Sequence, residues 1–396
     1  MKKLLFVITQ LYKGGAETAL VNLLSRISPE DYVIDLIILN QYPVKDAVSL
    51  IPMLPENINV FDQWKKTFHI PIFYKIKRKL HYILQNEFEH PSKAIQYVKE
   101  KNYDWAFHIG EWSSPKFVAN YVRAKNKAAW IHTDLSRLSN FESAGFFSYD
   151  NKINYYIFVS RNSLDASMDK FPQLKEKSFI IHNVLNDKFI ISQSKELLPF
   201  DESLPVIVTC ANIRLEKNHI RQIEVMAKLR DRGVRIKWLN LGSTADEGLY
   251  RKLLIEIEKK NLSQDFMFLG AVNNPYPYIK NASAVAVLSD YESWSMVITE
   301  AKILGVPVIA TKTSGALEQL EHEVTGILCD FDSNDIADKM ESFLCDKELQ
   351  KKIRDNITGF DSSATTLFSF KKLIEFNRSE TGTLVSHFYV NHNKNI

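Results

Sequence analysis

The sequence contains little cysteine and no long apolar run. Its 396 residues include only three cysteines, which are far apart and show no CxxC spacing. This excludes a disulfide scaffold and a zinc ribbon, and it is typical of a reducing compartment. No stretch approaches the ~20 apolar residues that a membrane span needs. The apolar run Leu4–Ile8 is too short for a signal peptide, so we expect a first β-strand there.

Acidic residues are missing from one stretch, although the net charge is only +3. Between Gln63 and Asn86, lysines and one arginine alternate with aromatic and aliphatic residues. Such a segment can lie on an anionic membrane surface, or its lysine stems can cover apolar surface. The small net charge and the lack of a recognisable binding module disfavour nucleic acid as a partner. We therefore expect a cytoplasmic protein, with Trp64–Tyr82 as the candidate for peripheral contact with the inner face of the cell membrane.

Short apolar runs alternate with helical patterns along most of the chain. The runs are apolar on both faces, which is typical of strands in a buried parallel sheet. Repeated βα units predict doubly wound sheets with right-handed crossovers. The predicted strands are Leu4–Thr9, Val33–Leu39, Trp105–Ile109, Ala128–His132, Tyr156–Ser160, Phe179–His182, Val206–Cys210, Ile236–Leu241, Phe266–Leu269, Ala284–Leu288, Val308–Thr311 and Gly326–Leu328.

A polar stretch divides this pattern into two halves. It spans Asn186–Pro205 and is rich in Ser, Lys, Asp and Glu. We predict an N-terminal domain over 1–186, a linker over 187–205, a C-terminal domain over 206–360, and a helix with a polar tail over 361–396. The fold class is α/β, with two Rossmann-like domains facing a central cleft, where open α/β sheets bind ligands.

The first candidate motif follows the first predicted strand. Gly14 and Gly15 precede a helical pattern, so the backbone can approach a ligand closely and the helix N-terminus favours an anion. A tight turn between strand and helix explains the same residues equally well.

The second candidate motif follows the strand Val206–Cys210. Arg214 and Lys217 lie three residues apart, and they can converge on one diphosphate, with a bidentate fork from arginine and a point charge from lysine. Ordinary surface cations at a helix start are the alternative.

The third candidate motif is the segment that holds Glu292 and Glu300, with a helix opening near Ser295. Were all eight intervening residues helical, the two acids would be ~12 Å apart along the axis and about 80° apart around it. They cannot share one proton or one metal, but they can hold the two ends of an extended ligand whose phosphates lie at the helix N-terminus. A nucleoside diphosphate sugar has this shape. The alternative is a loop carboxylate and an unrelated helix-surface glutamate.

Taken together, these motifs resemble a known family. Glu292–Glu300 resembles the Glu-x7-Glu region of retaining family-4 glycosyltransferases of the GT-B fold, and Gly14–Glu17 resembles their glycine turn. Arg214 and Lys217 match the family's diphosphate-binding pair, and Trp130–Asp134 resembles its N-domain histidine segment. The matches occur in the family's order and span most of the chain.

The resemblance implies a role for each matching residue. Glu300 would bind ribose hydroxyls, Glu292 would orient the donor sugar, and His132 would contact that sugar from the opposite domain. Arg214 and Lys217 would neutralise charge on the departing diphosphate. The other donor-binding positions would be Gly14, Gly15, Asn273, Asn274, Ser295, Met296 and Val297.

The resemblance also implies the reaction. We expect a hexosyl- or N-acetylhexosaminyltransferase that retains anomeric configuration, uses a UDP-sugar as substrate and needs no metal or other cofactor. Its acceptor would be a glycan or a lipid-linked glycan in cell-surface polysaccharide or glycolipid synthesis. Two alternatives are a nucleotide-sugar epimerase on the same fold and a non-catalytic glycan-binding partner of another transferase. Asp330–Asp332 has the DxD pattern of a different glycosyltransferase fold, but we expect Asp332 or Ser333 to cap a helix.

Overall fold

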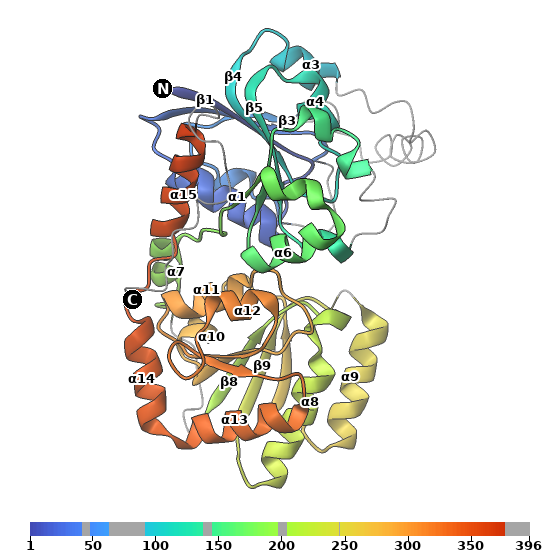
Figure 1. The fold of residues 1–396 in the computed structure, drawn as a ribbon. Coiled ribbons are helices and arrows are strands. Elements are labelled where there is room, and N and C mark those ends of the chain that lie inside the picture. The colour runs from blue at the N-terminus through green and yellow to red at the C-terminus, as the bar shows by residue number, and fades with distance from the viewer. Residues whose placement is uncertain (42–47, 63–91, 138–144, 197–203, 245, 377–396) are drawn as a thin grey trace. The chain divides into compact units, whose positions relative to one another are not determined.

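The computed structural model describes residues 1–41, 48–62, 92–137, 145–196, 204–244 and 246–376. They form two α/β units, which are residues 1–184 with 366–396, and residues 185–365. Each unit is built around one parallel sheet (Figure 1). The two-domain α/β fold expected from the sequence is therefore confirmed. The predicted segment Trp64–Tyr82 lies outside the described residues.

The first unit has a seven-stranded sheet in the order β3-β2-β1-β4-β5-β6-β7. Every neighbouring pair is parallel. The strands are β1 (Lys2–Ile8), β2 (Tyr32–Ile38), β3 (Asn59–Asp62), β4 (Tyr103–Ile109), β5 (Ala124–Ile131), β6 (Tyr155–Phe158) and β7 (Ser178–Ile180). The helices are α1 (Gly15–Arg26), α3 (Ser92–Val98), α4 (Lys116–Tyr121), α6 (Arg161–Lys170) and α15 (Ala364–Glu375).

The second unit has a six-stranded parallel sheet in the order β10-β9-β8-β11-β12-β13. The strands are β8 (Val206–Cys210), β9 (Lys237–Leu241), β10 (Phe266–Gly270), β11 (Ala284–Val287), β12 (Val308–Thr311) and β13 (Ile327–Cys329). The helices are α7 (Asp187–Gln193), α8 (His219–Asp231), α9 (Glu247–Lys259), α10 (Tyr276–Lys280), α11 (Met296–Ile303), α12 (Ser314–Gln319), α13 (Ser333–Cys345) and α14 (Lys347–Ile357).

Successive side chains along a strand point to opposite faces of the sheet, and both faces are buried. In the second unit, Ile207 and Trp238 pack with residues of α8, α9 and α13 on one face. Val208 and Val285 pack with residues of α7, α10 and α11 on the other. Because both faces are covered, the strands are almost continuously apolar, as the sequence pattern indicated.

The segment expected as a linker over 187–205 begins with helix α7. Asn186 caps this helix by accepting from the Phe189 amide at 3.1 Å. Asp187 is buried and accepts from the Ser362 amide at 2.9 Å, so the start of the segment is part of the second unit. The last helix, α15, lies mostly in the first unit, where Phe370 contacts Phe6 with a centroid distance of 6.5 Å.

Candidate active site

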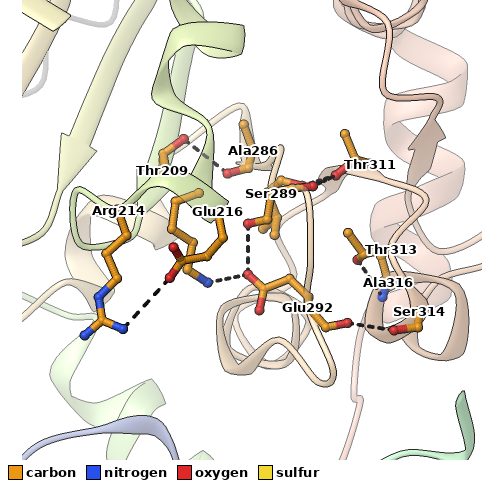
Figure 2. A network of polar contacts seen from close by, with 12 residues as sticks. Thr209, Arg214, Glu216, Ala286, Ser289, Glu292, Thr311, Thr313, Ser314 and Ala316 are labelled. Atoms are coloured by element: carbon orange, nitrogen blue, oxygen red, sulfur yellow. Dashed lines mark hydrogen bonds and ion pairs between the residues drawn. The ribbon is translucent and has the colours of Figure 1, made fainter. Parts of the chain in front are cut away.

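The predicted site residues of the second unit lie in the loops after β8, β10 and β11, at the carboxyl edge of its sheet, and on helix α11. The winding of this sheet reverses between β8 and β11, which is the point where open α/β sheets bind ligands. The loop after β8 carries Arg214 and Lys217, and the loop after β11 carries Glu292. Figure 2 shows Arg214, Ser289 and Glu292 at this edge. The strand order therefore brings the second and third motifs together.

Lys217 and Glu292 are in direct contact. The Lys217 ammonium lies 2.6 Å from Glu292 Oε1, and the same oxygen accepts from Ser289 Oγ at 3.0 Å. Both side chains are largely buried, with 25% and 13% of their surfaces exposed. The turn that presents Lys217 ends at Asn218, which has φ 47° and caps α8 by accepting from the Arg221 amide. Such a left-handed conformation is tolerated best by glycine and asparagine.

Arg214 has a different environment. Its side chain is 65% exposed, and its nearest acidic partner is Glu216 Oε1 at 3.9 Å from Nη1 (Figure 2). An exposed pair at this distance contributes little to stability. The guanidinium therefore keeps most of its donors available to a ligand.

The backbone of Glu292 is fixed by the start of helix α12. The Glu292 carbonyl accepts from Ser314 Oγ at 3.0 Å (Figure 2). It also accepts from the Gly315 amide at 2.8 Å. A Cβ at Gly315 would lie 2.8 Å from the Ser293 carbonyl carbon, so the approach needs glycine. The contact of Ser314 and Gly315 with Glu292 is known from the structure alone.

Helix α11 begins directly after this loop. Ser295 is its N-cap residue, yet its side chain makes no capping hydrogen bond. The first-turn amides of Met296 and Val297 therefore have no side-chain cap from Ser295. A helix N-terminus of this kind carries partial positive charge and favours a phosphate.

Glu300 lies further along α11, toward the end of β8. Burial, and next the charge of Glu300, raise the pKa of the Tyr276 hydroxyl. The same two causes raise the pKa of the Cys210 thiol. The charge of Glu300 therefore acts on Cys210, at the end of β8, and on Tyr276, at the start of α10.

Asn273 and Asn274 follow β10 and differ in their contacts. Asn273 is exposed. The Asn274 amide donates to the Gln193 carbonyl at 3.0 Å and to Glu196 Oε2 at 2.8 Å. This side chain therefore holds the end of α7, and its predicted place near a nucleotide base stays a prediction.

Gly14 and Gly15 lie at the start of α1 in the first unit. Gly14 is the N-cap residue, with φ −152°, which any residue can adopt. A Cβ at Gly14 would nevertheless lie 2.4 Å from Glu17 Oε2, whereas one at Gly15 would meet nothing within 4 Å. The nearby atom belongs to the end of a flexible side chain, so a Cβ at Gly14 would displace the Glu17 carboxylate.

His132 follows β5 in the first unit. Its amide donates to Glu111 Oε2 at 2.9 Å, and its ring lies between those of Trp112 and Trp130, with centroid distances of 6.3 and 6.4 Å. Neither ring nitrogen has a hydrogen-bond partner among the described residues. Burial lowers the pKa of His132 to about 4, so the ring is neutral at pH 7. A cavity of about 10 Å³, lined in part by Leu20, His132 and His182, lies beside it.

Asp332 is a helix cap, as the sequence predicted. Its carboxylate accepts from the amides of Asn334 and Asp335 at the start of α13, and Asp330 pairs with Lys312 at 2.6 Å. Among the described residues, no three His, Cys, Asp or Glu side chains are grouped to hold a metal ion.

Sequence reasoning missed Glu111 and Trp112 in the first unit. Both come directly after β4, and that position at the end of a predicted strand was the available signal. It is weak without the fold, because it does not show that Glu111 reaches the His132 backbone.

Part of this chain matches a known family. Residues 191–359 match the family described as "Glycosyl transferases group 1". The chain is 24% identical over 392 residues to N-acetylgalactosamine-N,N'-diacetylbacillosaminyl-diphospho-undecaprenol 4-alpha-N-acetylgalactosaminyltransferase of Campylobacter jejuni, covering 94% of this chain and 100% of that protein. It is 27% identical over 164 residues to N-acetyl-alpha-D-glucosaminyl L-malate synthase of Bacillus anthracis, covering 41% of this chain and 42% of that protein. The chain thus spans less than half of one curated relative and the whole of the other.

Solved structures show the same fold. HepE of Anabaena, in complex with UDP-glucose, has a TM-score of 0.72 at 19% identity, covering 95% of this chain and 100% of that one. A point mutant of TarM from S. aureus, in a complex that includes UDP, has a TM-score of 0.68 at 17% identity, covering 95% of this chain and 100% of that one. These likenesses establish the GT-B fold that the sequence predicted.

Proposed function

We propose a retaining sugar transfer, on the premise that this chain is a glycosyltransferase whose residues 191–359 belong to glycosyl transferases group 1. The donor would be a UDP-sugar that carries a hexose or an N-acetylhexosamine. The acceptor would be a glycan or a lipid-linked glycan in cell-surface polysaccharide or glycolipid synthesis. The observation that carries the proposal is the contact between Lys217 and Glu292 beside the start of α11.

The charges at this edge suit a diphosphate with a sugar attached. An ammonium group has three donors, and Lys217 uses one of them on Glu292. Lys217 can therefore bind a phosphate oxygen while it holds the Glu292 carboxylate beside the sugar. The exposed Arg214 guanidinium adds a second cation, and the α11 amides add further donors.

The same arrangement suggests how the reaction proceeds. The bond between the sugar C1 and the diphosphate oxygen breaks, and its electron pair stays on that oxygen. Lys217, Arg214 and the helix N-terminus stabilise the charge that develops there. The acceptor hydroxyl attacks C1 from the face that the diphosphate leaves, and its proton passes to the leaving phosphate oxygen. This path retains configuration and needs no protein nucleophile.

Glu300 would bind the nucleoside end. Its charge acts on Cys210, at the end of β8, and on Tyr276, at the start of α10. A carboxylate can accept hydrogen bonds from both ribose hydroxyls. The donor would thus extend from Glu300 to Glu292, with its diphosphate between them.

Donor base and acceptor class draw support from the comparisons. HepE is described in complex with UDP-glucose, and the TarM complex includes UDP. The Campylobacter jejuni relative is named for a sugar on a diphospho-undecaprenol lipid. We therefore favour uridine over guanosine in the donor and a lipid-linked glycan as the acceptor.

A lipid-linked acceptor would bring the enzyme to a membrane surface. No helix among the described residues is long and apolar enough to cross a membrane. We propose a cytoplasmic enzyme that is peripheral at the inner face of the cell membrane. The basic and aromatic segment Trp64–Tyr82, known here from its sequence alone, would make the contact.

Nucleotide release tests the proposal. The protein is incubated with a panel of UDP- and GDP-sugars, with and without a bacterial lipid extract as acceptor source. We expect UDP release that depends on the extract, and a product whose anomeric proton coupling by NMR matches that of the donor. Lys217→Ala should lower kcat on the order of 100-fold, as loss of a transition-state donor does. The matched exposed lysine variant Lys252→Ala should leave kcat unchanged.

Three results would contradict the proposal. Interconversion of UDP-sugars without release would indicate an epimerase. A product with inverted configuration would exclude retention. Failure of every nucleotide to bind would remove the donor site itself.

A further inference from the structure

The first unit has a switch point of its own, and two acids lie on the segments that follow its strands. Its sheet reverses its winding between β1 and β4, where open α/β sheets bind ligands. Glu17 lies in the first turn of the helix after β1, and Glu111 follows β4. At the switch point of the second unit, the loop after β8 carries Arg214 and Lys217, and the loop after β11 carries Glu292. Cations therefore lie beside an acid in the second unit, whereas Glu17 and Glu111 are both acids.

Glu111 is a buried acid with unused hydrogen-bonding capacity. Glu111 is only 6% exposed, and its Oε2 accepts from the His132 amide at 2.9 Å. No described residue hydrogen-bonds to Oε1. A buried carboxylate is costly unless its oxygens are hydrogen-bonded. Burial, and after it the nearby charge of Glu111, raise the pKa of Glu17, which shows that the two acids act on each other.

Trp112 provides an aromatic surface beside Glu111. Its side chain is 47% exposed, which is unusual for a residue of this size. Gly110 has φ 93°, and a Cβ there would lie 2.3 Å from Trp112 Cζ2, so the indole packs directly on the Gly110 backbone. Thr9 Oγ1 donates to Ser113 Oγ at 3.0 Å and ties the segment to the end of β1. The ring is therefore held in place with part of its surface open.

We propose that Glu111 and Trp112 form a subsite for a pyranose ring of the acceptor. The C–H face of a sugar packs on an aromatic ring, and its hydroxyls donate to carboxylate oxygens such as Oε1 of Glu111. His132, whose ring nitrogens have no partner among the described residues, adds a polar group 6.3 Å from the Trp112 ring.

Charge decides which sugar this subsite takes. Two neighbouring carboxylates repel a nucleoside diphosphate, whereas they attract the hydroxyls of an uncharged ring. The donor, with its diphosphate, is matched instead by the cations of the second unit. The assignment rests on the proposed function, because it takes the bound ring to be the acceptor of the transfer.

Sugar binding by the full chain tests the subsite, with methyl glycosides of glucose, galactose and N-acetylgalactosamine as probes. Saturation-transfer NMR should show at least one of them bound to the wild-type protein, and calorimetry should show UDP bound as well. Trp112→Ala should weaken glycoside binding at least ten-fold, and Glu111→Gln should weaken it several-fold. Neither variant should change UDP affinity more than two-fold, which also shows that each still folds.

Matched controls lie in the same unit. Phe368 is 53% exposed on α15, and Phe368→Ala should bind the glycosides as the wild type does. Glu176 is an exposed acid, and Glu176→Gln should do the same.

The possible failures are distinguishable. If UDP and GDP do not bind the wild type, the proposed function fails. If UDP binds but no glycoside does, or if Trp112→Ala binds glycosides normally, the subsite is wrong. If Trp112→Ala weakens UDP and glycoside alike, the residue serves the donor or the fold, and the acceptor assignment is overturned.

Discussion

Glu292 and Glu300 have the same chemistry but opposite surroundings. The Glu292 carboxylate is held by a cation and a hydroxyl, Lys217 and Ser289. The charge of Glu300 instead acts on a partly buried thiol and a partly buried phenol, Cys210 and Tyr276. The two acids therefore have different neighbours. The roles of the two acids can therefore be separated by ligands that carry only part of the donor.

Glu300→Ala should weaken UDP binding about ten-fold in calorimetry, because one hydrogen-bonded carboxylate contributes about 1.4 kcal/mol or more to affinity. Uridine alone should lose as much, since the acid would bind the ribose. Glu348→Ala, an exposed acid at the start of α14, serves as the matched control and should bind UDP normally. Unchanged UDP affinity in Glu300→Ala would refute its ribose role.

Residue positions were predictable only where the topology fixed them. Lys217 and Glu292 follow β8 and β11, which are neighbours in the sheet, so a doubly wound fold already implies that their loops meet. Their direct contact at 2.6 Å depends on rotamers that no sequence pattern shows. Glu111 was missed because its partner is the His132 backbone amide, and a backbone group leaves no residue-type signal.

Helices α11 and α12 form a support for the Glu292 loop. Thr299 Oγ1 on α11 donates to Gln319 Oε1 at 2.9 Å, and Gln319 Nε2 donates to the Gly315 carbonyl at 2.9 Å. Gly315 in turn donates to the Glu292 carbonyl. The start of α12, the body of α11 and the acidic loop are therefore connected through buried hydrogen bonds, and a change in one moves the others.

Gly315→Ala tests this support. Its Cβ would lie 2.8–2.9 Å from backbone atoms of Ser293 and Glu292, which cannot move as a flexible side chain does. We expect a loss of about 1–3 kcal/mol in the free energy of unfolding, measured by urea denaturation, and a lower kcat. At Gly248, an added Cβ meets only Asp246 Oδ1 at 3.5 Å, so Gly248→Ala should fold and act normally. Equal stability of the two variants would argue against the tight contact.

The sequence predicted strands as short as four residues, but it missed one edge strand and three short helices. Strands β8 and β12 have the predicted bounds, because both are apolar runs that end at polar residues. The missed elements are β3, α7, α10 and α12, which span four to seven residues each. Helices this short are not stable alone. They form because tertiary contacts hold them, as the Gln319 hydrogen bonds hold α12.

At the scale of the whole chain, the two units have similar sheet topology. The pattern of strands and helices predicted both sheets, because each strand is buried on two faces and each crossover is helical. The segment expected as a linker begins as part of the second unit, because Asp187 accepts a hydrogen bond from the Ser362 amide. A polar composition is typical of both a linker and a capped surface helix, and the sequence alone does not distinguish them.

Buried histidines make the two units differ in their response to acid. Burial lowers the pKa of His108 and His132 in the first unit to about 4, and it lowers the pKa of His182. In the second unit, burial lowers the pKa of His219 to about 4. A histidine with a depressed folded-state pKa binds fewer protons folded than unfolded. Its contribution to stability is therefore complete above pH 6.5 and is lost as the pH falls toward 4.

We expect the first unit to lose more stability than the second between pH 7 and pH 5, on the order of 1 kcal/mol per pH unit for each such histidine. Urea denaturation followed by short deuterium pulses, with peptides read by mass spectrometry, resolves the two units in one sample. The urea midpoint of peptides from residues 1–184 should fall further than that of peptides from 185–365. His322→Gln, at an exposed histidine of the second unit, should leave both shifts as they are. Three of the four buried histidines described lie in the first unit. A larger shift of the urea midpoint in the second unit, or equal shifts in both units, would therefore show that these histidines do not control the acid response.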